Sequence, residues 1–445
     1  MPTSCPAILI AAPASGQGKT TVACALARLH ARQGRRVHVF KCGPDFLDPY
    51  WLTLASGSAV HQLDLWMTGE ADCAQYLHDA ALEADLIIVE GVMGLFDGQP
   101  SAADLAQRFG LKVLTVIDAS AMAGTFGALA WGLQHYRAGL GFAGVLANQV
   151  ASSGHAAMLE NSLRDPAQWL GALMRNEALT LPERHLGLVM DHELGDAMVR
   201  LDAAANALTT TRLGQMTVDD LQAWAVDFDG SGVAGQDFPA GTLQGLTIAV
   251  AYDAAFCFLY AANICCLEAM GAKLVYFSPL RDSALPPCDA LWLPGGYPEL
   301  HAETLAANLD MKASITRHVQ AAKPVWAECG GMMAMFDQLT LIDGKSYSMW
   351  GILPGGATMQ KRLAALGPQQ LELTGGTLRG HTFHYSICVT PLQAKSRTRA
   401  APGRTSRGEG EALYVSGSVK ASYFHAWFAS SPAAAVGLFL KNTDD

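Results

Sequence analysis

The chain has 445 residues and a formal net charge of -10; half of its residues are hydrophobic and 16% are charged. This balance excludes an intrinsically disordered protein, and the negative charge disfavours non-specific binding, so no nucleic-acid partner is expected. The length exceeds that of one ordinary hydrophobic core, which predicts two domains.

The longest apolar runs, such as residues 8–12 and 86–89, are the size of single strands and too short to cross a membrane. The first residues carry no basic segment followed by an apolar stretch, so we expect a cytoplasmic protein without a membrane partner. The ten cysteines are scattered, without a CxxC pair or a Cys/His cluster at zinc spacing, which disfavours disulfides and structural zinc.

The first half of the chain alternates short β-branched runs with Ala/Leu-rich segments such as residues 20–33 and 122–136. Continuous apolarity is typical of strands that are buried on both faces, and this rhythm predicts a parallel sheet with helices on both sides. The predicted strands are residues 8–12, 37–40, 86–89, 113–117, 145–147 and 188–190.

Residues 8–23 read ILIAAPASGQGKTTVA, a strand that runs through a loop of small residues into a helix. This is the context of a phosphate-binding loop, although Pro13 stands where the pattern G-x-x-x-x-G-K-[ST] has its first glycine. Lys19 is expected to bridge the terminal phosphates of ATP, and Thr20 to place its hydroxyl on Mg²⁺. The expected ATP-binding residues of the loop are Ser15, Gly16, Gly18, Lys19, Thr20 and Thr21.

Two acidic motifs, KCGPDFLDP from Lys41 and EGVMGLFDG from Glu90, follow predicted strands. Ligands gather at the carboxyl ends of strands in open α/β sheets, so Asp45 and Glu90 are expected to join Thr20 around Mg²⁺. The alternative is that each carboxylate only caps a turn. Asn148, in VLANQV, is a candidate adenine reader, or else an ordinary turn former.

Residues 227–245 are rich in Gly and Asp and lack periodicity, which predicts a linker between a domain of residues 1–226 and a second of residues 246–445. The strand rhythm restarts there, while residues 400–410 have the composition of an exposed loop. The predicted strands of the second domain are residues 247–251, 274–277, 290–293 and 325–327.

Cys329 stands in PVWAECGGMM, where a buried strand turns into a helix. Such a turn exposes a nucleophile, and the helix end is expected to lower the thiol pKa. Gly330 and Gly296, the latter in the upstream turn LPGGYPEL, are the expected oxyanion donors. Taken alone, a cysteine of this kind is more often a buried core residue.

The candidate bases are His381, His384 and His425. Glutaminases of this class often carry His-x-Glu, but Trp427 stands at the position of that Glu, so a Cys329–His425 dyad is expected. The other two histidines are expected to be structural or to line the substrate route. Together, the two halves suggest that ATP activates a carboxylate as an acyl phosphate and that glutamine supplies the ammonia that replaces the phosphate.

The chain resembles the cobyrinic acid a,c-diamide synthases, glutamine amidotransferases of the cobalamin pathway. The resemblance spans nearly the whole chain, in APASGQGKTTV, KCGPDFLDPYW, EGVMGLFDG, LPERHLGLV, YDAAFCFLY, LPGGYPEL, AECGGMM and RGHTFHYS. It implies an α/β fold with a dethiobiotin-synthetase-like P-loop domain, followed by a flavodoxin-like class I glutaminase domain. Thr382 stands where the family motif has Glu.

The resemblance also implies roles for residues. Cys329 would be the nucleophile, His425 would raise its nucleophilicity, and Lys41 and Asp48 would lie near the activated carboxylate. The implied reaction uses ATP, Mg²⁺ and glutamine or ammonia to amidate the a and c acetate groups of a corrinoid macrocycle, and a homodimer is one assembly compatible with it.

Several alternatives remain open on the sequence. Hydrogenobyrinic acid a,c-diamide synthase acts on the cobalt-free macrocycle, and nickel-sirohydrochlorin a,c-diamide synthase on a related tetrapyrrole; neither is separable by these motifs. Cobyric acid synthase is disfavoured by the intact GKTT loop, and a non-catalytic P-loop ATPase with a regulatory glutaminase-like domain by the intact ECGG and His425.

Overall fold

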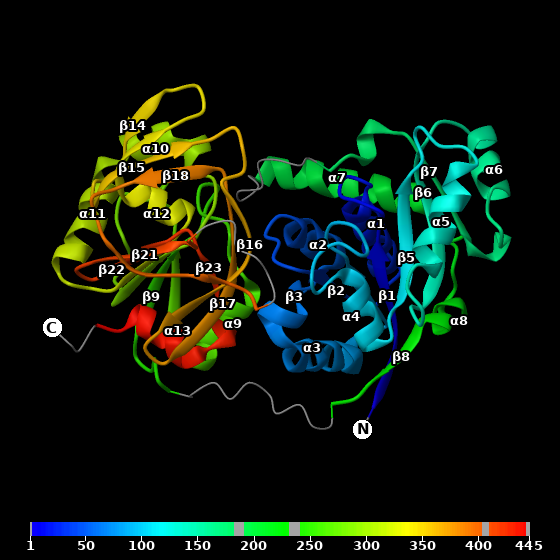
Figure 1. Cartoon of the computed structure of the whole chain (residues 1–445), viewed down its shortest axis with the longest axis horizontal. Helices are drawn as coiled ribbons and strands as arrows, with labels where there is room; N and C mark the ends of the chain where they lie inside the picture. The colour runs from blue at the N-terminus through cyan, green and yellow to red at the C-terminus, as the bar shows by residue number, and fades with distance from the viewer. Residues whose placement is uncertain (1, 182–190, 231–240, 403–408, 442–445) are drawn as a thin grey trace. The chain divides into compact units, whose positions relative to one another are not determined.

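The computed structural model describes residues 2–181, 191–230, 241–402 and 409–441, and these form two compact units (Figure 1). One unit contains the described residues up to 230, and the other those from 241 onward. The predicted strand at residues 188–190 lies outside the described residues, as do the LPERHLGLV segment after its first residue and parts of the predicted linker and of the 400–410 loop.

The first unit is built on a sheet whose strands run parallel, as predicted, except for the added strand β8 (Ala225–Phe228), which pairs antiparallel with β1. The predicted linker is therefore wrong at residues 227 and 228, because they pair with β1 as part of this strand. The sheet order is β3 (His61–Leu63), β2 (Val37–Cys42), β4 (Leu86–Glu90), β1 (Thr3–Ala11), β5 (Lys112–Asp118), β6 (Phe142–Val150) and β7 (Trp169–Met174).

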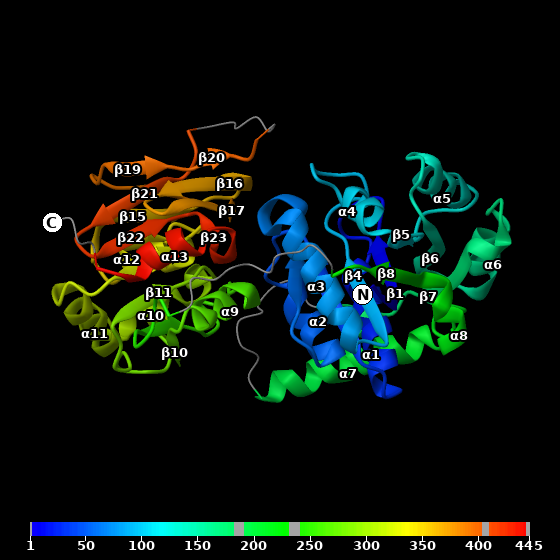
Figure 2. The same cartoon turned by 90° about the horizontal axis from the view of Figure 1, so that it is seen from below.

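Helices cover both faces of this sheet, as the rhythm of the sequence predicts (Figure 2). Leu9 and Ala11 of β1 pack into a core with residues of α3 (Glu70–Glu83), α4 (Ala102–Phe109) and α5 (Thr125–His135). Successive side chains of a strand point to opposite faces, so Ile8 and Ile10, which are fully buried, face the other side. The remaining helices of the unit are α1 (Lys19–Arg32), α2 (Asp48–Ser56), α6 (Ser153–Asn161), α7 (Asp191–Leu208) and α8 (Val218–Leu221).

The second unit has a main sheet that contains all four strands predicted for it. Its order is β10 (Lys273–Phe277), β9 (Thr247–Ala251), β11 (Ala290–Leu293), β12 (Val325–Glu328), β22 (Val419–Ser422), β21 (Ala412–Ser416) and β19 (Ala394–Arg397). Neighbouring strands are parallel from β10 to β22, and β21 and β19 extend the sheet antiparallel.

Two smaller sheets of the second unit have no counterpart in the sequence-based expectations. One contains β14 (Ser346–Ser348), β13 (Phe336–Thr340), β15 (Leu353–Met359) and β18 (Ser386–Val389). The other contains β20 (Arg399–Ala400), β16 (Ala365–Leu373), β17 (Gly376–His384) and β23 (His425–Trp427). Most of these strands are half-exposed and short, so they lack the continuous apolar runs that marked the parallel strands.

Strand β11 shows how the main sheet of this unit is covered on both faces. Leu291 and Leu293 pack into a core with α10 (Ala302–Ala307), α11 (Leu309–Gln320) and α12 (Gly330–Met335). Trp292, between them, points the other way and meets Phe428 and Phe439 with ring centroids 4.9 and 6.3 Å apart. Phe439 ends α13 (Pro432–Phe439); the remaining helix is α9 (Ala261–Ala269). None of the helices in the described ranges has the length and apolarity needed to span a bilayer.

Candidate active sites

The loop after β1 has the backbone of a phosphate-binding loop. Gly16 and Gly18 adopt φ of 76° and 92°, a left-handed conformation that glycine adopts without strain. Ser15 and Gly16 are exposed at the crest of the loop, whereas Thr21 is partly buried in the first turn of α1. The backbone N–H groups of the crest and of the α1 N-terminus can therefore meet an anion.

Asn148 supports this loop from β6. Its side-chain amide donates to the carbonyl oxygen of Gln17 at 3.0 Å, and a Cβ added to Gly18 would lie only 2.1 Å from its Nδ2. Asn148 is buried on β6, and its amide holds the backbone of the loop through this hydrogen bond. The structure thus places Asn148 against the backbone of the loop, which is a contact that its interpretation as an adenine reader had not anticipated.

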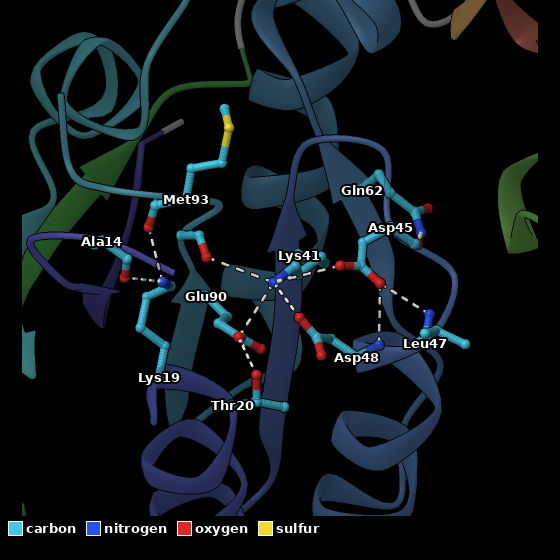
Figure 3. A network of polar contacts seen from close by, with 11 residues as sticks. Ala14, Lys19, Thr20, Lys41, Asp45, Leu47, Asp48, Gln62, Glu90 and Met93 are labelled. Atoms are coloured by element: carbon cyan, nitrogen blue, oxygen red, sulfur yellow. Dashed lines mark hydrogen bonds and ion pairs between the residues drawn. The ribbon is translucent and has the colours of Figure 1, made fainter. Parts of the chain in front are cut away.

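Lys19 is buried and its ammonium group donates to two carbonyl oxygens, Ala14 at 3.1 Å and Met93 at 2.7 Å (Figure 3). Met93, on the loop after β4, has φ of 51°, a left-handed conformation that costs energy for a residue with a side chain. Burial, followed by the nearby charge of Lys41, lowers the pKa of Lys19. A bound polyphosphate would replace these carbonyl partners by stronger, charged ones.

Lys41 is the centre of a buried charge cluster, the Lys41 cluster, which consists of Thr20, Lys41, Asp45, Asp48 and Glu90 (Figure 3). The parallel register pairs Lys41 of β2 with Glu90 of β4, so the sheet itself brings these two charges together. The Lys41 ammonium lies 2.5 Å from Asp48, 3.1 Å from Glu90 and 3.9 Å from Asp45. The hydroxyl of Thr20 donates to the same Glu90 oxygen at 2.7 Å.

The charges of this cluster stabilise one another. Burial lowers the pKa of Lys41, but Glu90 and the two aspartates outweigh burial and hold that pKa above its usual range. Burial raises the pKa of Glu90, and Lys41 offsets only part of this effect. Burial likewise raises the pKa of Asp48, yet Lys41 and Thr20 bring it below its ordinary value. Lys41 therefore keeps its charge, which lets the buried Glu90 and the two half-buried aspartates lie close together.

Asp45 has two roles in this arrangement. Its Oδ1 accepts the backbone N–H groups of Leu47 at 2.8 Å and Asp48 at 3.1 Å, and so it caps the turn that leads into α2. Its other oxygen faces Lys41. The turn-cap alternative for Asp45 is thus correct for one oxygen, while Glu90 and Asp48 lie closer to Thr20.

The donors of the Lys41 cluster fit Mg²⁺. The ion usually takes one or two carboxylates and completes an octahedron with phosphate oxygens and water. In the ranges that the structure describes, no group of three or more His, Cys, Asp or Glu side chains is placed to hold a metal alone. The Thr20 hydroxyl beside the Glu90 carboxylate offers the smaller set that Mg²⁺ needs when a nucleotide supplies the rest.

In the second unit, Cys329 occupies a strained turn between β12 and α12. Its φ of 46° and ψ of -106° are outside the regions that a non-glycine residue ordinarily adopts. Its N–H donates to the carbonyl of Ser422 at 2.7 Å, which fixes the turn to strand β22. Strain held by surrounding hydrogen bonds is typical of a nucleophile on a strand-to-helix turn.

Two glycine pairs meet beside Cys329, and we call this contact the glycine crossing: Gly295 and Gly296 after β11, and Gly330 and Gly331 after β12. A Cβ added to Gly330 would lie 3.0 Å from the Gly296 nitrogen, and one added to Gly331 would lie 2.1 Å from the Leu293 carbonyl oxygen. The structure thus brings together the backbones of Gly296 and Gly330, the two expected oxyanion donors. The N–H of Gly330 also acts on Cys329 in the direction that stabilises a thiolate.

The expected lowering of the Cys329 pKa is wrong for this conformation. Burial, followed by the charge of Glu299, raises the pKa of the Cys329 thiol far above its ordinary value, and the Gly330 N–H only partly opposes this. Helix α12 has six residues, and its field is outweighed by the loss of water around the sulfur. The resting residue is a thiol, so a base is needed to activate it.

His425 lies on β23 and is almost fully buried. Its Nδ1 is 3.8 Å from an oxygen of Glu328, the residue that directly precedes Cys329. The ring stacks on His381 with centroids 5.0 Å apart, and the hydroxyl of Tyr260 meets His381 Nδ1 at 3.0 Å. The structure therefore places the predicted base beside the turn that carries the predicted nucleophile, with a carboxylate that the sequence-based dyad did not include.

His384 belongs to a separate buried network. Its Nε2 lies 3.1 Å from Glu411, whose same oxygen accepts the Thr382 hydroxyl at 2.9 Å. Its Nδ1 meets the Ser386 carbonyl at 2.7 Å, and its ring stacks on Tyr423 at 3.8 Å. Thr382, which replaces the Glu of the family motif, therefore binds a carboxylate that another segment supplies, and both ring nitrogens of His384 are engaged.

Comparisons with known proteins agree with the two units. Residues 8–189 match a family model described as the CobQ/CobB/MinD/ParA nucleotide binding domain. Residues 247–433 match a model described as the CobB/CobQ-like glutamine amidotransferase domain. The two matches begin within β1 and at the first residue of β9, the first parallel strands of the two main sheets.

Curated relatives match the chain over nearly its whole length. It is 54% identical to hydrogenobyrinate a,c-diamide synthase of Stutzerimonas stutzeri, with 98% of both chains covered. It is 52% identical to the protein of the same name from Pseudomonas aeruginosa, with 99% of this chain and 98% of the relative covered. It is 46% identical to cobyrinate a,c-diamide synthase of Herminiimonas arsenicoxydans, with 97% and 96% covered.

The carboxylate of Glu299, in the turn before α10, provides a test of the electrostatics around Cys329. Burial raises the pKa of Glu299 to about 7, so the folded state holds its proton more tightly than the unfolded chain, and this contribution to stability falls as pH rises from about 4.5 through about 7. Glu299→Gln should therefore gain in melting temperature relative to the original chain between about pH 5 and about pH 8. Glu303→Gln, at an exposed site, is the control and should show no such gain. A loss for Glu299→Gln that grows with pH would contradict the assignment.

Proposed function

The chain belongs to the family of hydrogenobyrinate and cobyrinate a,c-diamide synthases, and on this premise we propose that it converts the a and c acetate groups of a corrinoid macrocycle to amides, using ATP and glutamine. The observation that carries the proposal is the presence, in one chain, of both sites that this reaction requires. These are the P-loop with the Lys41 cluster and the Cys329 turn with its glycine crossing.

The first unit activates the acetate carboxylate. The loop of Ser15, Gly16 and Gly18 binds phosphate through backbone N–H groups, while Lys19 leaves the carbonyls of Ala14 and Met93 to neutralise charge on the transferred phosphoryl group. The acetate oxygen displaces ADP from the γ-phosphate, which gives an acyl phosphate. Ammonia then attacks the acyl carbon, loses a proton and expels inorganic phosphate.

Lys41 and Asp48 lie at the carboxyl ends of the strands, where an acetate arm can approach. We assign Lys41 to binding of the incoming carboxylate, which would compete with Asp48 for the same ammonium. Thr20 and Glu90, with Asp45 further out, would hold Mg²⁺, which supplies charge neutralisation of the nucleotide when bound. We propose a cytoplasmic location, where ATP and glutamine are supplied, and a homodimer as the assembly.

The second unit supplies the ammonia. The Cys329 proton passes to His425, and the sulfur attacks the δ-carbonyl carbon of glutamine. The resulting oxyanion is met by the N–H groups of Gly330 and Gly296. Collapse of this intermediate breaks the C–N bond, and the leaving nitrogen takes the proton back from the imidazolium. Water then hydrolyses the thioester and releases glutamate.

The cobalt-free macrocycle is our preferred substrate, because the two relatives with 54% and 52% identity are named for hydrogenobyrinate. With ATP and glutamine, the purified chain should add two amide nitrogens to hydrogenobyrinic acid, detectable by mass spectrometry of the product. Turnover of cobyrinic acid should be slower. If the chain amidated neither macrocycle, the proposal would be refuted. Faster turnover of cobyrinic acid than of hydrogenobyrinic acid would reverse the assignment of the substrate.

Cys329→Ala should reduce glutamine-dependent amidation by more than about 10³-fold, because the thioester cannot form. Amidation with added ammonium salt should continue at the original rate, since ammonia enters after the thioester step. The two rates can be measured by the same product assay. Full glutamine-dependent turnover in this variant would show that Cys329 is not the nucleophile.

Lys19→Ala should reduce amidation by about 10²-fold or more with glutamine and with ammonia alike, because it removes charge stabilisation from phosphoryl transfer. Lys112→Ala is the matched control and should keep activity, because Lys112 begins strand β5, at the end away from the carboxyl ends of the strands where the P-loop lies. Release of phosphate and formation of amide are the two readouts. Survival of ammonia-dependent synthesis in Lys19→Ala would contradict the role of the P-loop in activation.

A further inference from the structure

We propose that Glu328, the residue immediately before the nucleophile, is the positioning residue for His425 in glutamine hydrolysis. The proposal rests on the proposed function of the second unit. It replaces the expected dyad by a triad of Cys329, His425 and Glu328, in which the carboxylate comes from strand β12 instead of from the strand that carries the histidine.

The distances define a directed contact. One oxygen of Glu328 lies 3.8 Å from Nδ1 of His425, with both side chains at most 2% exposed. The other oxygen accepts the indole N–H of Trp326 at 2.6 Å. The carboxylate is therefore held on one side by Trp326 and turned on the other toward the imidazole. At 3.8 Å the pair is at ion-pair distance, and a hydrogen bond forms when the ring becomes charged and draws closer.

The usual position of the third residue is filled by a different kind of side chain. Trp427, two residues after His425, is fully buried and packs its ring against Tyr260 at a centroid distance of 5.0 Å. No carboxylate can reach the imidazole from that position. The side chain of Glu328 reaches it because β12 and β22 are neighbouring parallel strands, and the chain passes from β22 to His425 within three residues.

Glu411 is a partly buried carboxylate of the same region, and it interacts electrostatically with His425. The oxygen of Glu411 nearest to a histidine already receives His384 at 3.1 Å and Thr382 at 2.9 Å. Each of the two histidines thus has its own carboxylate, His384 with Glu411 and His425 with Glu328. This pairing leaves Glu328, and not Glu411, as the carboxylate that positions the proposed base, His425.

The remaining neighbours of His425 keep its ring in one plane. His381 stacks on one face, and Phe258 lies 6.1 Å away, centroid to centroid. A Cβ added to Gly295, on the glycine crossing, would lie 2.4 Å from Cε1 of His425. Because Nδ1 faces Glu328, it carries the proton in the neutral ring, which leaves the lone pair of Nε2 to accept the proton of Cys329.

This arrangement has an electrostatic consequence for catalysis. When Cys329 transfers its proton, the imidazolium that forms is buried, and a buried cation without a counter-charge is costly. The Glu328 carboxylate supplies that counter-charge in the step where it is needed. The other titratable groups near the ring are His381 from β17, whose pKa burial lowers so that it stays neutral, and Glu411 from the segment before β21.

Glu328→Gln tests the proposal because it keeps the shape of the side chain and removes its charge. We expect kcat for glutamine hydrolysis to fall about 10²-fold with KM changed less than about threefold, since substrate contacts are untouched. The acidic limb of the kcat profile should move to lower pH, because the imidazolium loses its counter-charge and gives up its proton more readily. Glu328→Asp should shift the limb in the same direction by less.

Two controls separate positioning from a merely structural role. Glu411→Gln removes the carboxylate paired with His384 and should move the acidic limb less than Glu328→Gln does. Ammonia-dependent amidation should keep its original rate in every variant of this series, since it does not use the triad. The second readout is the rate at which a diazoketone analogue of glutamine labels Cys329, followed on the Cys329 peptide by mass spectrometry; this rate should fall in parallel with kcat.

An acidic limb and a labelling rate unchanged in both Glu328→Gln and Glu328→Asp would overturn the proposal. Equal losses in Glu328→Gln and Glu411→Gln with no movement of the limb would do the same, because they would indicate a packing role. If the original chain hydrolyses no glutamine, the proposed function fails. If the original chain hydrolyses glutamine and the Glu328 variants hydrolyse it equally well, the positioning role alone fails.

Discussion

The glutaminase unit depends on a close approach of two backbones at the carboxyl ends of β11 and β12. A side chain at Gly331, after β12, would lie 2.1 Å from the carbonyl oxygen of Leu293 in β11, and one at Gly330 would lie 3.0 Å from the nitrogen of Gly296. Only glycine permits this approach, and the approach sets where the proposed oxyanion donors and the Cys329 turn lie. The nucleotide unit also has close approaches at glycine, and one of them places the side-chain amide of Asn148 against Gly18 of the P-loop.

Residues that sit on long parallel strands could be predicted from the sequence, because burial on both faces imposes a continuous apolar run. The P-loop follows such a strand in the first unit, and the GGYPE and ECGG turns follow two neighbouring parallel strands in the second, so each lies at the carboxyl end of a strand. The strands from β13 to β23 could not be found in this way. Most of them are short or half-exposed, and some pair with partners that are distant in sequence, as β17 does with β23 at His381 and His425.

Side-chain partners were the least predictable part of the sites. The contact between Lys41 and Glu90 follows from strand register, but register is not visible without the sheet. The sequence did not predict the approach of Glu328 to His425. The usual His-x-Glu pattern places the acidic partner two residues after the histidine, whereas here the carboxylate stands in the ECGG motif. The two sites also differ in charge: the Lys41 cluster contains its own cation, whereas the Cys329 turn is surrounded by carboxylates that raise the thiol pKa.

That raised pKa bears on how the protein survives between turnovers. Peroxide and metabolic electrophiles react with thiolates far faster than with thiols, so a nucleophile that stays protonated at rest is chemically quiet. Cys329 is 5% exposed, and burial raises its pKa in the resting conformation. If Cys329 reacts only within the proposed triad, a chain with ten cysteines keeps one reactive sulfur without exposing it to oxidative loss.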